Sequence, residues 1–333
     1  MSVDALTPLD LAPRRATWAI AWTVTSRIAQ MAATLLVASF LSFVFLQMAP
    51  GDPVTMLLGE RAADPQAVAR LQARFHLDQP VVVQYWHWLS GVFTGDLGTS
   101  YVFGQDVRSM IAARLPTTLT LVSYSSVLVI AFGFFAGLIA ARSKQYVDTG
   151  ISIILSIALA TPSYVIAIGL ITVFSLYLDW FPVFGSGEGF WGRLHHLTLP
   201  AITLALSSSA ALARVTRASL IEESRRDHVA TAVVRGFRPG EVLRRHVIRN
   251  ALLPITTIGG IIVAALVAGT VIVEKAYGLD GVGSLLVLAI TRKDYPVVQG
   301  VGVLIIAGFL IMNALVDMLY TAIDPRTRTM EAR

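Results

Sequence analysis

Residues 214–249 read RVTRASLIEESRRDHVATAVVRGFRPGEVLRRHVIR and lie between two long apolar segments. The stretch holds nine Arg, four acidic residues and no Lys. Because so many charges are too costly to place in hydrocarbon, we expect a loop between two membrane-spanning helices. An ordinary positive loop on the cytoplasmic side, which every multispanning protein needs, is the simplest interpretation.

A helical pattern nevertheless runs through this loop. Asp227 suits an N-cap, and Val229, Ala232 and Val233 follow it at the three-to-four spacing of one helix face. Gly236 then interrupts the pattern, so the first helix is expected to end there.

A second short helix is expected after this break. Pro239 suits its first position and Glu241 its first turn. Val242, His246 and Arg249 would then lie on one side of it. Two short helices bent about a glycine form a projecting knob, which in a membrane protein is typical of a docking element.

The composition is that of a membrane protein. Of 333 residues, 55% are hydrophobic and 14% are charged, whereas charged residues make up about a quarter of a soluble chain. The absence of Cys excludes disulfides and cysteine-ligated metal sites. The net charge of +5 does not require a nucleic-acid partner, because positive residues also orient membrane proteins.

Six charge-free runs predict six transmembrane helices, since about 20 apolar residues span a bilayer. The start of the fourth run carries His195, His196 and Pro200, so its boundary is the least defined. The runs are 28–51, 115–141, 149–178, 194–213, 250–273 and 295–316. The expected organisation is a cytoplasmic segment (1–27), a first span (28–51), an extracytoplasmic segment (52–114), a five-span core (115–323) and a cytoplasmic tail (324–333).

Positive charges in the short loops predict the orientation. Arg142 and Lys144 lie between the second and third runs, and Arg326 and Arg328 follow the sixth. Together with residues 214–249 they belong on the cytoplasmic side, as do both termini.

Several catalytic signatures are missing. None of the three Lys follows a Gly, so the phosphate-binding sequence GxxxxGK[ST] is absent, and HExxH and GxSxG are absent too. The adjacent His195 and His196 would point in different directions on a helix, so no shared metal is expected. We therefore expect no catalytic residue, no cofactor and no ATP hydrolysis by this chain.

The middles of the runs carry no charged residue, and Glu274, Lys275 and Asp317 lie near their ends, where we expect interfacial positions. A proton-coupled carrier would be expected to bury a carboxylate in a span. Sodium sites built from carbonyl groups remain open. Gly133 and Gly137 are four residues apart, which predicts close packing against another helix.

Three stretches, the last of them largely within the loop described above, occur in a fixed order along the chain. They are MAPGDP (48–53), LDQPVVVQYWHWLSGVFTGDLGTS (77–100) with ARLPTTLTL (113–121), and DHVATAVVRG (227–236) with VLRRHVIRNALLP (242–254). In this order and at these places between the spans, they resemble the permease subunits of bacterial ABC importers. The match is to the peptide and nickel branch, which includes the dipeptide and oligopeptide permeases, and runs from about residue 25 to the C-terminus.

The resemblance implies an all-α polytopic fold of the type I importer kind, with a cytoplasmic pair of coupling helices and an extracytoplasmic segment after the first span. Such a subunit sits in the bacterial inner membrane and forms half of a passive path. Its implied partners are a second homologous permease in a heterodimer, two ATP-binding subunits and an extracytoplasmic substrate-binding protein. Nucleic acid is not among them.

The chain departs from the pattern of this branch at several positions. Residues 230–232, where the family usually has EAA, are Ala-Thr-Ala, so no acidic contact can be assigned there. His228 stands where Tyr or Phe is usual, Arg238 where a small or capping residue is usual, and Asp106 where Pro is common. The subfamily and the substrate are therefore not fixed by the resemblance.

The resemblance places the ATPase-docking site in the loop. Val229, Val233 and Phe237 are expected to be exposed and to fill an apolar cleft, while Arg235, Arg238, Arg244 and Arg245 pair with acidic groups at its rim. The full candidate set is Asp227, Val229, Ala230, Thr231, Ala232, Val233, Arg235, Gly236, Phe237, Arg238, Glu241, Arg245 and His246. The residues of the substrate path are not identifiable.

Peptides are the expected cargo, and import of nickel or a metal chelate in the same branch is the alternative. An ion-coupled secondary transporter and a structural membrane scaffold are rivals from other classes. Dependence of transport on an ion gradient without ATPase partners would favour the first. Absence of substrate flux from a reconstituted complex would favour the second.

Overall fold

The computed structural model describes residues 12–48, 54, 58, 64–74 and 78–323, and the regular elements in these ranges are helices. Most of the MAPGDP stretch and the tail 324–333 lie outside the described residues. The elements are α1 (Ala12–Met48), α3 (Pro65–Arg74), α4 (Val81–Thr94), α5 (Val107–Arg142), α6 (Gln145–Ala160), α7 (Ser163–Leu170), η2 (Ile171–Tyr177), α8 (Gly189–Ser224), α9 (Asp227–Val234), α10 (Pro239–Val242), η3 (Leu243–Ile248), α11 (Arg249–Ala276), α12 (Val282–Thr291) and α13 (Tyr295–Ile323). The segments η2 and η3 are π-helical.

Five stretches in the described part of the chain are long and apolar enough to cross a membrane. They are Thr25–Met48, Val107–Arg142, Gly189–Ser224, Pro239–Ala276 and Tyr295–Val316. The span predicted over 149–178 is not one continuous helix, because α6 and the pair α7–η2 meet at a bend of 105°. A residue before proline is disfavoured in the helical region, and Thr161, which precedes Pro162, is extended at φ −84° and ψ 123°. A sixth span exists only if this bent pair is counted as one.

The sequence explains where α5 begins. Asp106 lies just before the helix, and its carboxylate accepts a hydrogen bond from the backbone N–H of Ser109 at 2.9 Å. This is the side-chain capping that Asp provides at helix N-termini. Asp106, which stands where the branch commonly has proline, therefore still starts a helix. Helix α5 begins at Val107, earlier than the charge-free run that starts at 115.

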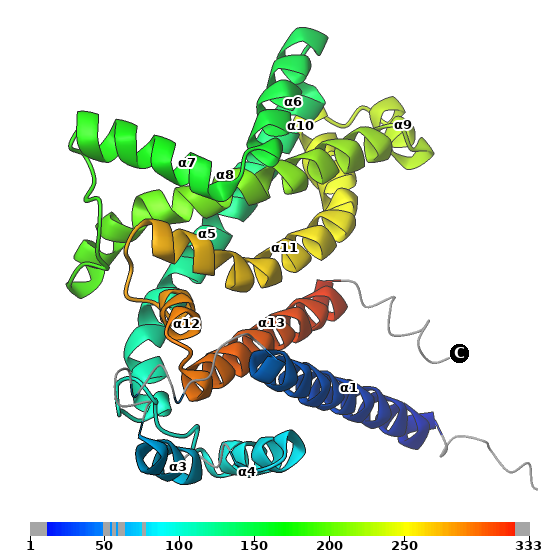
Figure 1. Cartoon of the computed structure of the whole chain (residues 1–333). Helices are drawn as coiled ribbons and strands as arrows, with labels where there is room; N and C mark the ends of the chain where they lie inside the picture. Colours follow the sequence, from blue (N-terminus) through cyan, green and yellow to red (C-terminus); the bar gives the residue numbers. More distant parts are fainter. Residues whose placement is uncertain (1–11, 49–53, 55–57, 59–63, 75–77, 324–333) are drawn as a thin grey trace, which may run out of the picture.

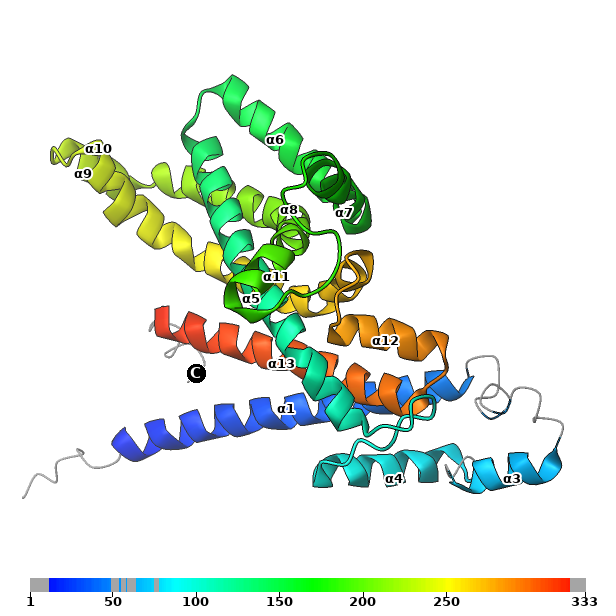
Figure 2. The same cartoon turned by 90° about the vertical axis from the view of Figure 1, so that its left-hand side faces the viewer.

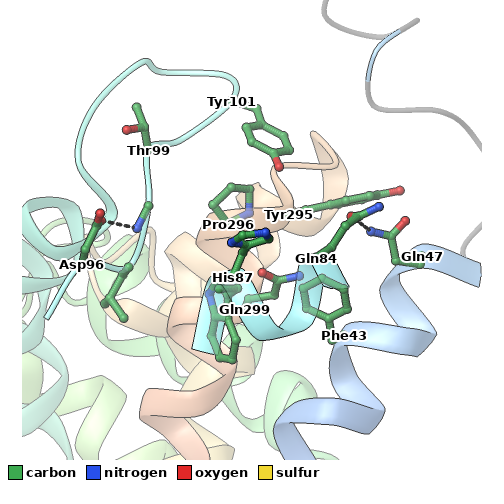
Figure 3. A pocket seen from close by; sticks show the side chains of 13 residues that line it. Phe43, Gln47, Gln84, His87, Asp96, Thr99, Tyr101, Tyr295, Pro296 and Gln299 are labelled. Carbon is green, nitrogen blue, oxygen red and sulfur yellow. Dashed lines mark hydrogen bonds between the residues drawn. The ribbon is translucent and has the colours of Figure 1, made fainter. Parts of the chain in front are cut away.

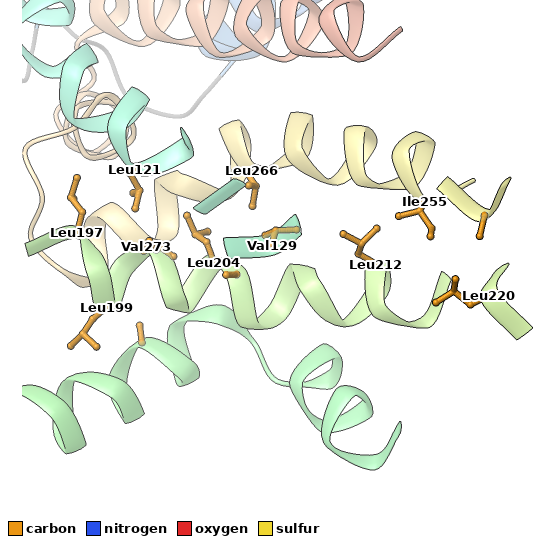
Figure 4. Packing of buried hydrophobic residues seen from close by; sticks show 14 of the residues in the cluster. Leu121, Val129, Leu197, Leu199, Leu204, Leu212, Leu220, Ile255, Leu266 and Val273 are labelled. Carbon is orange, nitrogen blue, oxygen red and sulfur yellow. The ribbon is translucent and has the colours of Figure 1, made fainter. Parts of the chain in front are cut away.

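The core is formed where α5, α8 and α11 pack together (Figure 4). A Cβ on Gly133 would lie 2.7 Å from the Cβ of Leu212, and one on Gly137 would lie 2.5 Å from the carbonyl oxygen of Ala213. These separations leave no room for a side chain. The predicted close packing at Gly133 and Gly137 is confirmed, and its partner is α8.

A second apolar cluster joins the start of α5 to α12 and α13, with Val107, Leu285 and Val301 among its most buried members. Helix α1 packs beside α13 at the edge of the molecule, and α4 lies across the end of α1 (Figures 1 and 2). Tyr85 of α4 is buried against Phe40 and Phe43 of α1, and its hydroxyl lies 2.9 Å from that of Ser39.

The helices define two opposite ends of the molecule. The N-terminal end of α1, the C-terminal end of α13 and the α9–α10 knob lie towards one end, whereas α3 and α12 lie towards the other (Figures 1 and 2). We call these the knob end and the α12 end.

Two buried carboxylates fix the α12 end. Asp294 accepts hydrogen bonds from the hydroxyl of Ser100 and from the backbone N–H of Tyr101, so it ties residues 100–101 to the start of α13. Glu274 accepts from the hydroxyl of Thr118 at 2.6 Å and from the backbone N–H of Ser284 at 2.9 Å. Glu274 lies near the end of α11, as expected, but its side chain is fully buried within the protein and joins α5, α11 and α12.

Candidate functional site

The loop of residues 214–249 is more helical and more continuous than expected. Its first part belongs to α8, which runs through to Ser224. Helix α9 follows after two residues, and α10 continues through η3 into α11, so that 239–276 forms one long helical segment. The second short helix is therefore not separate but is the projecting beginning of the next span. Asp227 is the first residue of α9, and the cap position belongs to Arg226.

Gly236 ends α9 in a left-handed conformation with φ +80°. The N–H of Gly236 donates to the carbonyl of Val233 at 2.9 Å, and that of Phe237 donates to the carbonyl of Ala232 at 3.3 Å. These two bonds form a Schellman motif, which favours glycine at this position. No atom lies within 4 Å of a Cβ built on Gly236, so backbone conformation rather than space requires the glycine.

Pro239 and Glu241 take the places expected of them. Pro239 occupies the first turn of α10, where its missing N–H costs nothing, and Glu241 lies in the same turn. Glu241 also forms an ion pair with Arg245 at 2.8 Å across one helical turn.

The apolar residues of the knob divide into an inner and an outer set. Val229, Ala232, Val242 and Val247 are buried in the main core. The expectation that Val229 is an exposed anchor is therefore wrong, because the knob uses it to pack against the body of the protein. The outer set is Val233, Val234 and Phe237, exposed by 59%, 88% and 39%. Val234 was not among the expected docking residues. It is five residues after Val229, and this helical spacing turns its side chain away from the face that Val229 buries.

A polar cluster holds the knob to the ends of α8 and α11. The carboxylate of Glu223, buried at the end of α8, lies 3.0 Å from Nε of Arg226 and 3.2 Å from Nε2 of His228. The amide nitrogen of Asn250 lies 3.2 Å from the same His228 nitrogen and donates to the carbonyl of His246 at 2.9 Å. His228, the departure from the usual aromatic residue, thus lies where α8, α9 and α11 meet, and its Nε2 either donates to Glu223 or accepts from Asn250, depending on the tautomer. We call Glu223, His228 and Asn250 the latch.

The outer face of the knob is basic. Arg235, Arg238, Arg244 and Arg245 are exposed, as are Asp227, Ala230 and Thr231. An open groove of about 670 Å³ lies beside them, lined by Phe237, Arg244, Arg245, His246, Ile248, Arg249 and Leu252. Apolar and cationic groups meet in this groove, and this combination suits a partner surface that offers both apolar and acidic side chains.

His195 and His196 each contact backbone carbonyls of the preceding loop. Nε2 of His195 lies 2.9 Å from the carbonyl oxygen of Trp180, and Nδ1 of His196 lies 3.1 Å from that of Gly185. Their position at the start of α8 makes them part of the attachment of this loop.

Relatives of known classification match almost the whole chain. Residues 133–329 match the family described as binding-protein-dependent transport system inner membrane component, and residues 22–122 match the N-terminal region of such membrane components. A protein of Brucella abortus (strain 2308), named as a candidate peptide transport system permease, is 38% identical over 309 residues, covering 92% of this chain and 98% of that protein. The glutathione transport system permease protein GsiC of Escherichia coli O6:H1 is 36% identical over 306 residues, covering 92% and 98%.

Solved structures agree on the fold. A chain of the methionine ABC transporter MetNI in an inward-facing conformation superposes with a TM-score of 0.55 at 16% identity, covering 65% of this chain and 96% of that chain. The native crystal form of the same transporter gives a TM-score of 0.52. The chain therefore has the permease fold of ABC importers, and it belongs to the binding-protein-dependent transport system inner membrane component family, as a multi-pass inner-membrane permease of an ABC importer.

Proposed function

We propose that this chain forms half of the path of a peptide importer and couples it to separate ATPase subunits through the knob. The peptide cargo is supported by the relatives, one named for peptide transport and one for the transport of glutathione, itself a small peptide. The family implies ATPase and binding-protein partners. We further propose that the second permease is a homologous, non-identical subunit.

One observation carries the docking proposal. The knob presents an outer apolar edge (Val233, Val234, Phe237) and a basic groove, while its inner face is packed into the core and its base is fixed by the latch. A docked element can transmit motion only if it moves as one body with the spans. The packing of Val229 and the continuity of α10 with α11 provide this rigidity.

The same arrangement supports the proposed topology. The knob, the N-terminal end of α1 and the C-terminal end of α13 lie towards one end (Figures 1 and 2). With the Arg distribution of the short loops, we place this end in the cytoplasm, together with both termini, and residues 52–114 outside. The domain limits given above are proposed on the same basis.

The decisive experiment is reconstitution in vesicles with the partner permease, the ATPases and the binding protein. We expect uptake of labelled dipeptides or oligopeptides that requires ATP. Uptake of nickel or a metal chelate in place of peptides would assign the cargo to the other part of the branch. Uptake driven by an ion gradient without ATPases would refute the coupling proposal.

A further inference from the structure

A cavity of about 420 Å³ lies at the α12 end, bordered by three parts of the chain that are far apart in sequence: α1, α4 with the loop after it, and the start of α13 (Figure 3). Phe43 and Gln47 of α1, Gln84 and Trp88 of α4, residues 96–101 and the start of α13 form its walls. Its volume falls within the roughly 300–1,000 Å³ typical of small-ligand sites. It lies at the opposite end from the knob, so the docking proposal does not account for it.

The wall formed by residues 96–101 is held in place. Asp294, fully buried, accepts hydrogen bonds from the hydroxyl of Ser100 and the N–H of Tyr101, and the carboxylate of Asp96 accepts from the N–H of Gly98 at 2.8 Å. The cavity is therefore preformed by tertiary contacts, as most ligand sites are.

Gln299 of α13, a residue only 6% exposed, lines the cavity. In the part of the chain that the structure describes, no group forms a hydrogen bond to its carboxamide. A carboxamide has two N–H donors and an acceptor oxygen, and those of Gln299 lie at the cavity wall, where a ligand can reach them. Figure 3 shows this side chain beside His87 and Phe43.

A second carboxamide completes a pattern of donors and acceptors. Nε2 of Gln47 donates to Oε1 of Gln84 at 2.8 Å, and Nε2 of Gln84 donates to the carbonyl of Gln79 at 2.8 Å. This chain of bonds fixes the carboxamide of Gln47 and uses its nitrogen, while its oxygen remains an acceptor at the rim of the cavity (Figure 3).

The remaining lining mixes aromatic rings with His87, Leu97, Thr99 and Pro296, and the described residues that form it include no Lys or Arg. Phe43, Trp88 and Tyr295 offer apolar surface, and Asp96 is the one carboxylate on the lining. Carboxamides match the N–H and C=O groups of a peptide unit, aromatic rings accept apolar side chains, and a carboxylate attracts an ammonium group.

We propose that this cavity binds a short peptide with a free amino terminus, the main chain contacting Gln299 and Gln47 and the ammonium group directed to Asp96. The inference rests on the proposed function in peptide import and adds a binding site for the cargo within this subunit. The site would receive peptide at the face that we propose to be extracytoplasmic.

The test is direct binding of radiolabelled tri-alanine to the complete transporter in nanodiscs, without its binding protein. Gln299→Leu keeps the size of the side chain and removes its hydrogen bonds, so affinity is expected to fall about tenfold or more. Gln47→Leu, at the rim, is expected to weaken binding as well and serves if Gln299→Leu fails to assemble. Gln105→Leu, exposed and outside the cavity, should bind like wild type.

Tri-alanine with a blocked amino terminus tests the ammonium contact. It should bind the wild type more weakly than free tri-alanine does, and Asp96→Asn should reduce this difference in affinity.

Unchanged affinity in both Gln299→Leu and Gln47→Leu would overturn the site, as would no measurable binding to the wild type. If either result accompanies normal ATP-dependent peptide uptake with the binding protein present, the cavity inference fails while the proposed function stands. Loss of peptide uptake in the wild type, with another cargo transported, would overturn the proposed function instead.

Discussion

At the scale of single residues, the backbone of Gly236 sets the shape of the knob. Its φ of +80° is easily reached by glycine, whereas a side chain in the left-handed region costs roughly 1–2 kcal/mol, and more for a β-branched residue. We expect Gly236→Val to uncouple ATP hydrolysis from uptake while the chain still inserts into the membrane. The measurement is the ratio of ATP hydrolysed to peptide imported in reconstituted vesicles.

Two matched changes separate conformation from side-chain size. Gly236→Asn should behave nearly like wild type, since Asn tolerates the left-handed region. Gly240→Ala should also be tolerated, because Gly240 has no positive φ and no atom lies near a Cβ built on it. Wild-type coupling in Gly236→Val would show that the Schellman turn does not matter for transmission.

The latch makes a second residue-scale prediction. Glu223→Gln keeps the shape of the side chain but removes the charge that faces Arg226 and His228, so the knob should be held less firmly. Arg226 then faces a neutral side chain in place of a buried carboxylate, so we expect a lower melting temperature, corresponding to roughly 1 kcal/mol or more, with weakened coupling. Glu222→Gln, whose exposed carboxylate lies 3.4 Å from Arg226, is the control and should cost less than about 1 kcal/mol. Equal melting temperatures of Glu223→Gln and Glu222→Gln would show that the latch does not stabilise the knob.

At the scale of elements, the outer edge of the knob is predicted to be where the ATPase binds. Phe237→Ala should weaken assembly by roughly 2 kcal/mol or more if this ring is a hot spot. Single Arg→Ala changes at Arg235, Arg238 or Arg244 should cost about 1 kcal/mol or less, with a loss that depends on salt. Co-purification of the ATPase over a salt series measures both effects.

Val229→Ala is the control for this element, because Val229 is buried in the main core rather than on the outer edge. It should lower the thermal stability of the chain before it changes the salt dependence of assembly. Retention of the ATPase by Phe237→Ala at the wild-type level would exclude Phe237 as an anchor.

Element positions also show how far sequence reasoning reaches. Charge-free runs located the spans, and small residues four apart located the contact of α5 with α8, because both patterns are local. The 105° bend lies at Pro162, and a proline within an apolar run does not by itself show whether the chain kinks slightly or turns sharply. Glu274 is buried beside Thr118, which lies 156 residues earlier in the chain, and Val229 is buried in the main core of the protein. Periodicity within one helix cannot specify contacts of this kind.

The same limit applies to the candidate sites. The knob is one continuous stretch, so its helices, its glycine turn and its basic character were predictable from the sequence. The latch joins residues of three helices, and the cavity joins α1, α4 and α13 across most of the chain. Gln299 lies in an apolar run where no motif marks it, so only the fold brings it to a cavity.

At the scale of the whole molecule, the proposed topology can be tested with single cysteines, because the chain has none of its own. Ser100, an obvious choice in the segment proposed to be outside, is buried against Asp294 and would be a poor reporter. Gln105→Cys is exposed in the same segment, and Gln145→Cys is exposed at the start of α6 on the proposed inner side. An impermeant thiol reagent should label Gln105→Cys in intact cells and Gln145→Cys only after the membrane is disrupted. The reverse pattern would invert the topology.

The last prediction concerns the isolated chain, which we expect neither to hydrolyse ATP nor to transport peptide. Its sequence lacks the P-loop lysine that would hold the phosphates of ATP, so we expect the energy to come from another polypeptide. The knob suits the coupling that we propose: it is packed at its inner face, contacts the latch and is continuous with α11, and α11 reaches Glu274 at the far end, where α5 and α12 meet. Displacement of the knob is thereby linked to the end that holds the cavity. Purified chain in vesicles should show only background ATPase activity and uptake, and both should appear together when the ATPase subunits, the partner permease and the binding protein are added. Peptide uptake by the chain alone would refute the proposal that separate ATPase subunits drive transport. Unchanged transport by full complexes carrying Gly236→Val or Glu223→Gln would show that motion does not pass through the knob.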